Sequence, residues 1–163
     1  MKRIVSLMAL AAMPCVAQVA NELTISADAA LDIVASALRH CRAEGQKVSV
    51  TVVDAAGRVK ASVRDDGAAP HTAEHSMRKA YTALSYKVPS AEYGKRAQEA
   101  KGIAIGPQLL PNITTAAGGV PIRHGNAVIG AVGVSGTPGS AGGGEHDAKC
   151  AEAGIAKLKP ASS

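Results

Sequence analysis

Aromatic residues are scarce in this 163-residue chain, which has no Trp, no Phe and three Tyr. Proteins that bind single-stranded nucleic acid stack the bases on aromatic side chains, so nucleic acid is not an expected partner. The formal charge of +5 falls to +3 when Lys2 and Arg3 are left out. This mild surplus fits solubility better than it fits a nucleic-acid surface.

Several catalytic and cofactor motifs are also missing. The sequence has no C-x-x-C-H motif for covalent haem, no C-x-x-C pair and no evident Ser-His-Asp arrangement. The glycine-rich segment 136–145, GTPGSAGGGE, lacks the GK[ST] ending of a phosphate-binding loop. An enzyme is not excluded, but the sequence favours a binding protein.

The one long apolar run lies in the first twenty residues. Lys2 and Arg3 precede the apolar residues 4–13, and small residues follow Pro14. The run is too short to span a bilayer, and the pattern is typical of a secretory signal peptide over residues 1–20. We expect cleavage near residues 17–20, no membrane span, and one domain over residues 21–160 that is periplasmic or secreted.

Cleavage would leave two of the three cysteines, Cys41 and Cys150. Two cysteines in an oxidising compartment can form a disulfide, and two separate buried thiols are the equal alternative. A disulfide would require Cα atoms within roughly 7 Å of each other. The sequence leaves this choice open.

Hydrophobic periodicity and turn residues predict a mixture of helices and strands. The predicted helices cover 26–43, 72–85, 91–101 and 145–158, and the predicted strands cover 47–54, 58–65, 113–123 (one or two strands) and 127–136. Ser26 and Ser90 are expected helix caps, and Leu31 is expected on the buried stripe of the first helix. This order predicts an α+β fold with a largely antiparallel sheet. A core of Ala, Val, Ile and Leu buries little area per residue, which favours a homo-oligomer.

Five segments resemble one known family in their order. They are RDDGAAPHT (64–72), RKAYTAL (78–84), GGVPI (118–122), GNAVIGAVGVSG (125–136) and EHDAKCAEAG (145–154). Over residues 23–159 the chain resembles the GlcG/HbpS family, also called the haem-binding or haem-degrading domain. The resemblance implies a profilin- or PAS-like, five-stranded antiparallel sheet with packed helices, and a homo-oligomer. Some members bind haem or iron, and others accompany glycolate, diol or corrinoid metabolism.

The strand glycines within these segments need an explanation. Gly118, Gly119, Gly130, Gly133 and Gly136 allow close backbone approach. That approach serves either close packing, which we favour, or the binding of a flat ligand.

Residues 71–75, HTAEH, match the H-x-x-E-H pattern of inverted zinc proteases. Pro70 places His71 at a helix start, and no obvious helix at the usual downstream distance supplies the remaining acidic ligand, so protease chemistry is not expected. His71 is instead predicted as an axial haem ligand, or as a base beside a small ligand. His75 and Glu74 are further candidate metal ligands. The alternative is a histidine that merely begins a helix.

Cations and a tyrosine complete the predicted site. Arg64, Arg78 and Lys79 suit haem propionates or a substrate carboxylate, although a solvated face is their more common place. Tyr81 is a candidate hydrogen-bond donor or iron ligand, with a half-buried core position as the alternative.

Three functions follow as hypotheses. The first is an exported protein that binds haem or another tetrapyrrole, or iron, for sequestration, sensing or an accessory role. The second is a small-molecule enzyme or accessory protein of hydroxy-acid metabolism, with His71 as the base. The third is a structural oligomer without a ligand.

Overall fold

The computed structural model describes residues 21–100, 109–139 and 143–158, so the predicted signal peptide and much of the loop expected over 102–112 lie outside the described residues. The elements are α1 (Ala27–Ala43), β1 (Ser49–Asp54), β2 (Val59–Arg64), α2 (His71–Tyr86), α3 (Ser90–Glu99), β3 (Gly119–His124), β4 (Ala127–Ser135) and α5 (Gly143–Ile155). Within these ranges, no helix has the length and apolar character needed to cross a bilayer.

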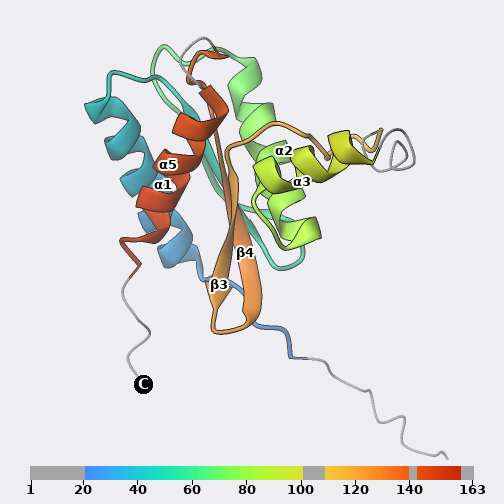
Figure 1. Cartoon of the computed structure of the whole chain (residues 1–163). Coiled ribbons are helices and arrows are strands. Elements are labelled where there is room, and N and C mark those ends of the chain that lie inside the picture. Colours follow the sequence, from blue (N-terminus) through green and yellow to red (C-terminus); the bar gives the residue numbers. More distant parts are fainter. Residues whose placement is uncertain (1–20, 101–108, 140–142, 159–163) are drawn as a thin grey trace, which may run out of the picture.

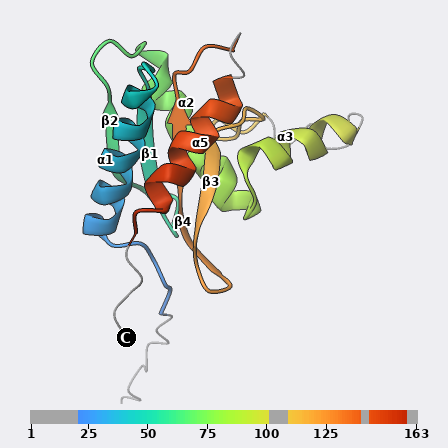
Figure 2. The ribbon, with the colours of Figure 1, turned by 60° about the vertical axis from the view of Figure 1, so that its left-hand side comes forward.

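The described strands form one antiparallel sheet in the order β2-β1-β4-β3. Helices α1 and α5 lie side by side on one face of the sheet, and α2 covers the other face (Figures 1 and 2). The predicted α+β class with an antiparallel sheet is confirmed. The predicted fifth strand is wrong for the described residues, since the sheet has four strands.

Side chains explain why no extra strand forms before β3. Thr82 Oγ1 accepts a hydrogen bond from the Thr114 amide at 2.9 Å, and Ser90 Oγ donates to the Ala116 carbonyl at 2.8 Å. These backbone groups are therefore satisfied without a neighbouring strand. The prediction that Ser90 caps α3 is also wrong, because Ser90 is the first helical residue and Pro89 holds the cap position.

Helix α1 begins as predicted, because the Ser26 side chain accepts a hydrogen bond from the Ala29 amide at 3.2 Å. Its buried face includes Ile33, Val34 and Leu38. Leu31 was expected on that face but is 57% exposed, since the inward stripe runs through positions 30, 33, 34, 37, 38 and 41. At the start of α1, the buried position is thus Ala30 and not the predicted Leu31.

The two faces of β1 carry different side chains. Val50 and Val52, with Val48 just before the strand, belong to the apolar core shared with α1 and α5. On the α2 side, the Ser49 hydroxyl lies 2.7 Å from Thr72 Oγ1, and Thr51 Oγ1 lies 2.8 Å from Ser76 Oγ. Helix α2 therefore packs on the sheet through buried hydroxyl pairs as well as apolar contacts.

Cys41 of α1 and Cys150 of α5 form a disulfide, with sulfur atoms 2.00 Å and Cα atoms 5.7 Å apart. Both residues are fully buried. The bridge joins positions 109 residues apart. A loop of that length stabilises the folded state by about 4–5 kcal/mol in the chain-entropy model.

Close packing of α2 on β4 depends on Gly133. A Cβ atom at this position would lie 2.0 Å from the Ser76 carbonyl oxygen and 2.6 Å from the Ala80 amide nitrogen. Backbone atoms cannot move aside as a flexible side chain can. Close packing, the explanation favoured for the strand glycines, therefore accounts for the glycine at position 133.

We predict that Gly133→Ala lowers the free energy of unfolding by about 2–3 kcal/mol, because the added methyl group overpacks the contact between α2 and β4. Urea denaturation measures the change. Gly139→Ala is the matched control, since a Cβ atom there meets nothing within 4 Å. Equal stability of the two variants would contradict the packing account.

Candidate functional site

The loop before α2 is anchored so that His71 begins the helix. Buried Asp65 accepts hydrogen bonds from Arg42 Nε at 3.1 Å and from Arg42 Nη2 at 2.7 Å. The hydrogen bond from Arg42 holds the pKa of Asp65 below its usual value, against the effect of burial. Arg64, predicted to bind a ligand, donates to the Ala68 carbonyl of this loop. The loop thus reaches α2 in a defined position.

His71 is exposed and borders two cavities. The first, of about 250 Å³, is lined by His71, Glu74, His75 and Arg78. The second, of about 400 Å³, has His75, Lys79, Ser135, Thr137 and Asp147 among its lining residues. The HTAEH segment and Lys79 therefore lie around two cavities that share His71 and His75.

The candidate metal ligands of this segment do not form a preformed metal cluster. Within the described ranges, a single group of three His, Cys, Asp or Glu residues has donor atoms that converge within 4.8 Å, and it lies elsewhere. The Glu74 carboxylate is paired with Arg78 one turn along the helix. His71, Glu74 and His75 share a cavity without converging on one point.

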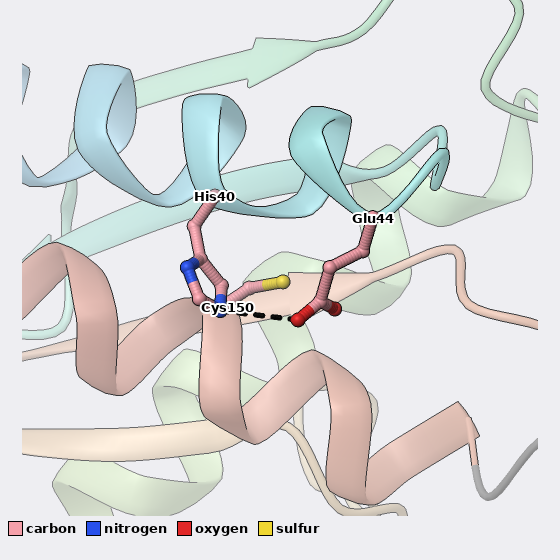
Figure 3. A group of neighbouring side chains, drawn as sticks. All are labelled: His40, Glu44 and Cys150. Carbon is pink, nitrogen blue, oxygen red and sulfur yellow. Dashed lines mark ion pairs between the residues drawn. The ribbon is translucent and has the colours of Figure 1, made fainter.

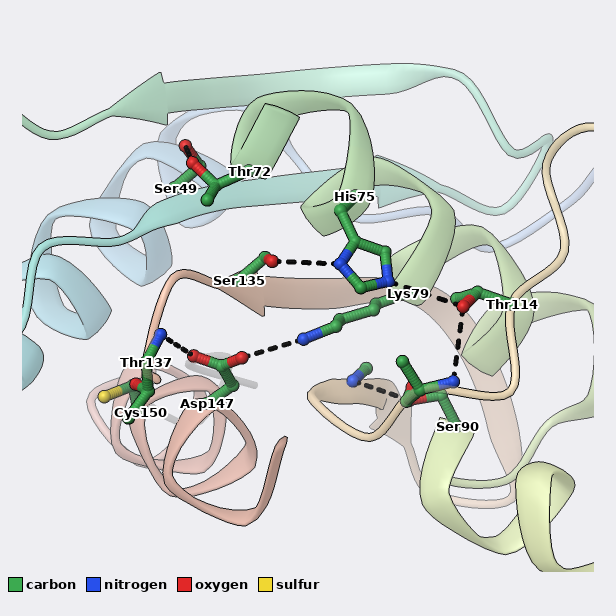
Figure 4. A network of polar contacts seen from close by, with 12 residues as sticks. Ser49, Thr72, His75, Lys79, Ser90, Thr114, Ser135, Thr137, Asp147 and Cys150 are labelled. Carbon is green, nitrogen blue, oxygen red and sulfur yellow. Dashed lines mark hydrogen bonds and ion pairs between the residues drawn. The ribbon is translucent and has the colours of Figure 1, made fainter. Parts of the chain in front are cut away.

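His75 is half-buried, and both of its ring nitrogens face hydroxyl groups (Figure 4). Nδ1 lies 3.2 Å from Ser135 Oγ, and Nε2 lies 3.4 Å from Thr114 Oγ1. Burial lowers the pKa of His75 below 6.5, and the positive charge of Lys79 lowers it further. Asp147 opposes this shift, whereas His71 and Arg78 add to it. A neutral imidazole is therefore favoured at neutral pH.

A buried ion pair forms one wall of the larger cavity (Figure 4). Lys79 Nζ lies 2.8 Å from Asp147 Oδ2, and each side chain is 3% exposed. The Thr137 amide donates to Asp147 Oδ1 at 3.1 Å. The solvated face considered for Lys79 is wrong, because a protein carboxylate binds its ammonium group inside the fold. Sequence reasoning missed Asp147, although it lies in the EHDAKCAEAG segment.

Thr137 adds an unsatisfied group to the same cavity. Its Oγ1 atom is buried and has no hydrogen-bond partner among the described residues. A buried hydroxyl without a partner costs about 1–3 kcal/mol. A polar group of a ligand, or a water molecule, would satisfy it.

Tyr81 lies away from these cavities. Its side chain is half-buried, as in the alternative to a ligand role, and it lines a separate depression of about 280 Å³ with Gly57, Leu84 and Lys87. Tyr81 follows His71 by ten positions, or roughly 15 Å along the helix. The structure therefore brings His71, His75 and Lys79 together, but not Tyr81 or Arg64.

We predict that the folded protein loses stability as the pH falls below about 6.5. The unfolded chain binds a proton on His75 near its ordinary pKa of 6.5, whereas the folded state binds it only at lower pH. The unfolded state thus holds more protons in this range, and the free energy of unfolding rises with pH.

Urea denaturation of wild type and His75→Gln between about pH 5 and 7 tests this prediction. The variant should show a smaller rise of stability with pH. His124→Gln is the control, since His124 is exposed at the β3–β4 turn. Identical pH dependence in wild type and His75→Gln would contradict the proposed titration.

Comparisons with known proteins agree with this fold. The chain is 31% identical to a Streptomyces reticuli HbpS double mutant in which two glutamates are replaced by aspartate, with a TM-score of 0.80 over 92% of this chain and 99% of that chain. A Klebsiella pneumoniae protein, ORFY, of family DUF336, is 28% identical, with a TM-score of 0.75 over 91% of this chain and 100% of that chain. A PduOC–haem complex has the same fold at 23% identity and a TM-score of 0.74, over 84% of this chain and 96% of that chain.

Among curated protein sequences, none matches the chain. The model of the family described as "Haem degrading protein HbpS-like" matches residues 25–156, which include every element from α1 to α5. This range agrees with the resemblance over 23–159 noted in the sequence. The chain therefore belongs to the HbpS-like family.

Proposed function

We propose that the protein is an exported haem- or tetrapyrrole-binding protein that sequesters, senses or delivers its ligand, and that His71 is the axial ligand. The observation that carries this proposal is the position of His71 at the edge of both cavities. The family description and the haem-bound neighbour PduOC support haem as the ligand.

His71 suits iron better than His75 does. The His71 side chain is exposed, so an imidazole nitrogen can reach a ligand without displacing protein. His75 has both ring nitrogens beside hydroxyl groups. We assign His75 the role of a neutral wall residue behind the bound ligand.

The cavity walls suit a flat ring with acidic substituents. The larger cavity has small apolar side chains and glycines along part of its wall, namely Ala116, Ala117, Pro138 and three glycines. Arg78 borders the other cavity and is paired with exposed Glu74. An exposed pair of this kind contributes little stability, so Arg78 can exchange Glu74 for a haem propionate.

A small hydroxy acid is the second candidate ligand. The unsatisfied Thr137 hydroxyl lines the same cavity as His71, and together they offer a hydroxyl group and a base beside the Lys79–Asp147 ion pair. The cavity volume of about 400 Å³ lies within the usual range for small-molecule sites.

We predict that ferric haem binds the mature protein with a saturable Soret shift, and that His71→Ala weakens binding at least about tenfold by removing the iron ligand. Absorbance titration measures both. His124→Ala is the matched control, because it removes an exposed histidine outside both cavities.

Two results would count against this assignment. A His71→Ala variant that folds, by circular dichroism, and keeps the wild-type Soret band would exclude His71 as the ligand. A wild-type protein without any Soret shift would exclude haem binding, and saturable glycolate binding would then support the hydroxy-acid candidate.

Export and self-association are further parts of the proposal. The signal-peptide pattern and the disulfide fit an oxidising compartment. Edge strand β2 exposes Val59 at 54% and Val63 at 41%, and α1 exposes Leu31 at 57%. These apolar side chains and the open strand edge suit contact with another copy of the chain.

We predict that protein from the periplasm lacks the first 17–20 residues, has a two-hydrogen mass deficit before reduction, and sediments as a homo-oligomer. Intact mass spectrometry and sedimentation velocity measure these properties. A retained Met1, two free thiols or a monomer would each refute the corresponding part.

A further inference from the structure

A second group of ligand-type side chains lies where α1 ends beside α5 (Figure 3). His40 and Glu44 stand one helical turn apart, and Cys150 approaches them from α5. None of the three lines the cavities around His71. Their role is therefore separate from the proposed haem site.

The distances fit one transition-metal ion. The donor atoms of His40, Glu44 and Cys150 all lie within 4.8 Å of one another, and His40 Nε2 is 3.5 Å from Glu44 Oε1. Tetrahedral zinc, with bonds of about 2.0–2.3 Å, holds its ligand atoms about 3.3–3.8 Å apart. Small side-chain rotations would bring this group to that geometry.

His146 offers a fourth ligand. Its Nδ1 atom lies 3.7 Å from Glu44 Oε2 and has no hydrogen-bond partner among the described residues. A neutral histidine nitrogen is a usual zinc ligand beside cysteine and carboxylate. His146 lies outside the group of three converging donors, so it becomes a fourth ligand only if its side chain moves toward the ion on binding.

The disulfide controls this group, because Cys150 Sγ is bonded to Cys41 and has no thiolate to offer. We propose that reduction of the Cys41–Cys150 disulfide creates a zinc-type metal site from His40, Glu44 and Cys150, with His146 as the fourth ligand. A cellular or added thiol of the dithiol class supplies two electrons and two protons. The disulfide becomes two thiols, and the dithiol becomes its own disulfide.

Metal binding then removes one proton from the Cys150 thiol. The thiolate and the Glu44 carboxylate balance the double charge of the ion, while both histidines bind as neutral rings. His40 and Glu44 lie at the C-terminal end of α1, where the helix dipole favours a cation. Their side chains are 41% and 39% exposed, which gives the ion access from solvent, and Cys150 lies buried behind them.

Reduction with metal binding therefore replaces the disulfide between α1 and α5 with a metal ion. In the oxidised protein the disulfide joins α1 to α5, and in the reduced protein the metal joins the same two helices. The protein would therefore bind zinc only under reducing conditions.

Two cysteine variants separate this proposal from a general effect of losing the disulfide. Cys41→Ser leaves the Cys150 thiol free, and Cys150→Ser leaves only Cys41. Each is titrated with cobalt(II), whose thiolate bond gives a charge-transfer band in the near ultraviolet. A phosphine reductant prevents the remaining free thiol of each variant from forming intermolecular disulfides. Circular dichroism checks that both variants fold.

We expect Cys41→Ser to bind one cobalt with the thiolate band, and zinc to displace it. Cys150→Ser should lack the band, and adding His40→Ala to Cys41→Ser should weaken binding at least about tenfold. The matched control adds His124→Ala instead, which should leave binding unchanged. Equal bands in the two cysteine variants, or no band in folded Cys41→Ser, would overturn the proposal.

Wild-type protein provides the test if the cysteine variants do not fold. It should bind cobalt after reduction by the phosphine and not before. Glu44→Gln should then weaken binding at least about tenfold in the reduced state. Cobalt bound equally with and without reduction would refute the redox control.

Discussion

The buried ion pair between Lys79 and Asp147 is the contact around which this structure is organised. With each side chain 3% exposed, either charge alone would be costly, and breaking such a pair usually costs about 3–5 kcal/mol. A Cβ atom at Gly118 would lie 2.9 Å from Asp147 Cβ and 3.0 Å from Lys79 Cδ, and one at Gly119 would lie 2.0 Å from the Lys79 carbonyl. Gly118, just before β3, and Gly119, its first residue, thus leave room for α2 and α5 to approach each other at this ion pair.

Three of the family segments meet at this one place. RKAYTAL contributes Lys79, GGVPI contributes the two glycines, and EHDAKCAEAG contributes Asp147. The same contact joins α2 to α5 and, through the Thr137 amide, holds the strand end that borders the larger cavity. Fold and candidate site therefore depend on the same residues, and a change at this contact affects both.

Local patterns allowed much of the fold to be predicted. The Ser26 cap, the β1–β2 hairpin and the helix that begins at His71 depend on neighbours within a few residues. The failures involve distant partners. Lys79 and Asp147 are 68 positions apart in the sequence. The Ser90 hydroxyl donates a hydrogen bond to the carbonyl of Ala116, 26 positions away, instead of capping its own helix. The expected fifth strand failed for the same reason, since side chains from other elements bind the backbone before β3.

The two faces of the sheet carry different side chains, and each candidate site lies on a different face. The valine face packs against α1 and α5, where the disulfide and the second ligand group lie. The hydroxyl-rich face meets α2 and places neutral His75 and exposed His71 beside open cavities. A wall that combines small apolar residues, hydroxyl groups and one exposed histidine suits a ligand with an apolar surface and a metal that can accept an imidazole nitrogen.

We propose that His71 binds the iron of a haem held at this wall. Anomalous diffraction at the iron absorption edge, from crystals of the haem complex, tests it most directly. We expect an iron peak at bonding distance from a His71 ring nitrogen, beside the cavities that His71 shares with His75. An iron peak elsewhere, or a bound haem whose iron has no bond to His71, would contradict it.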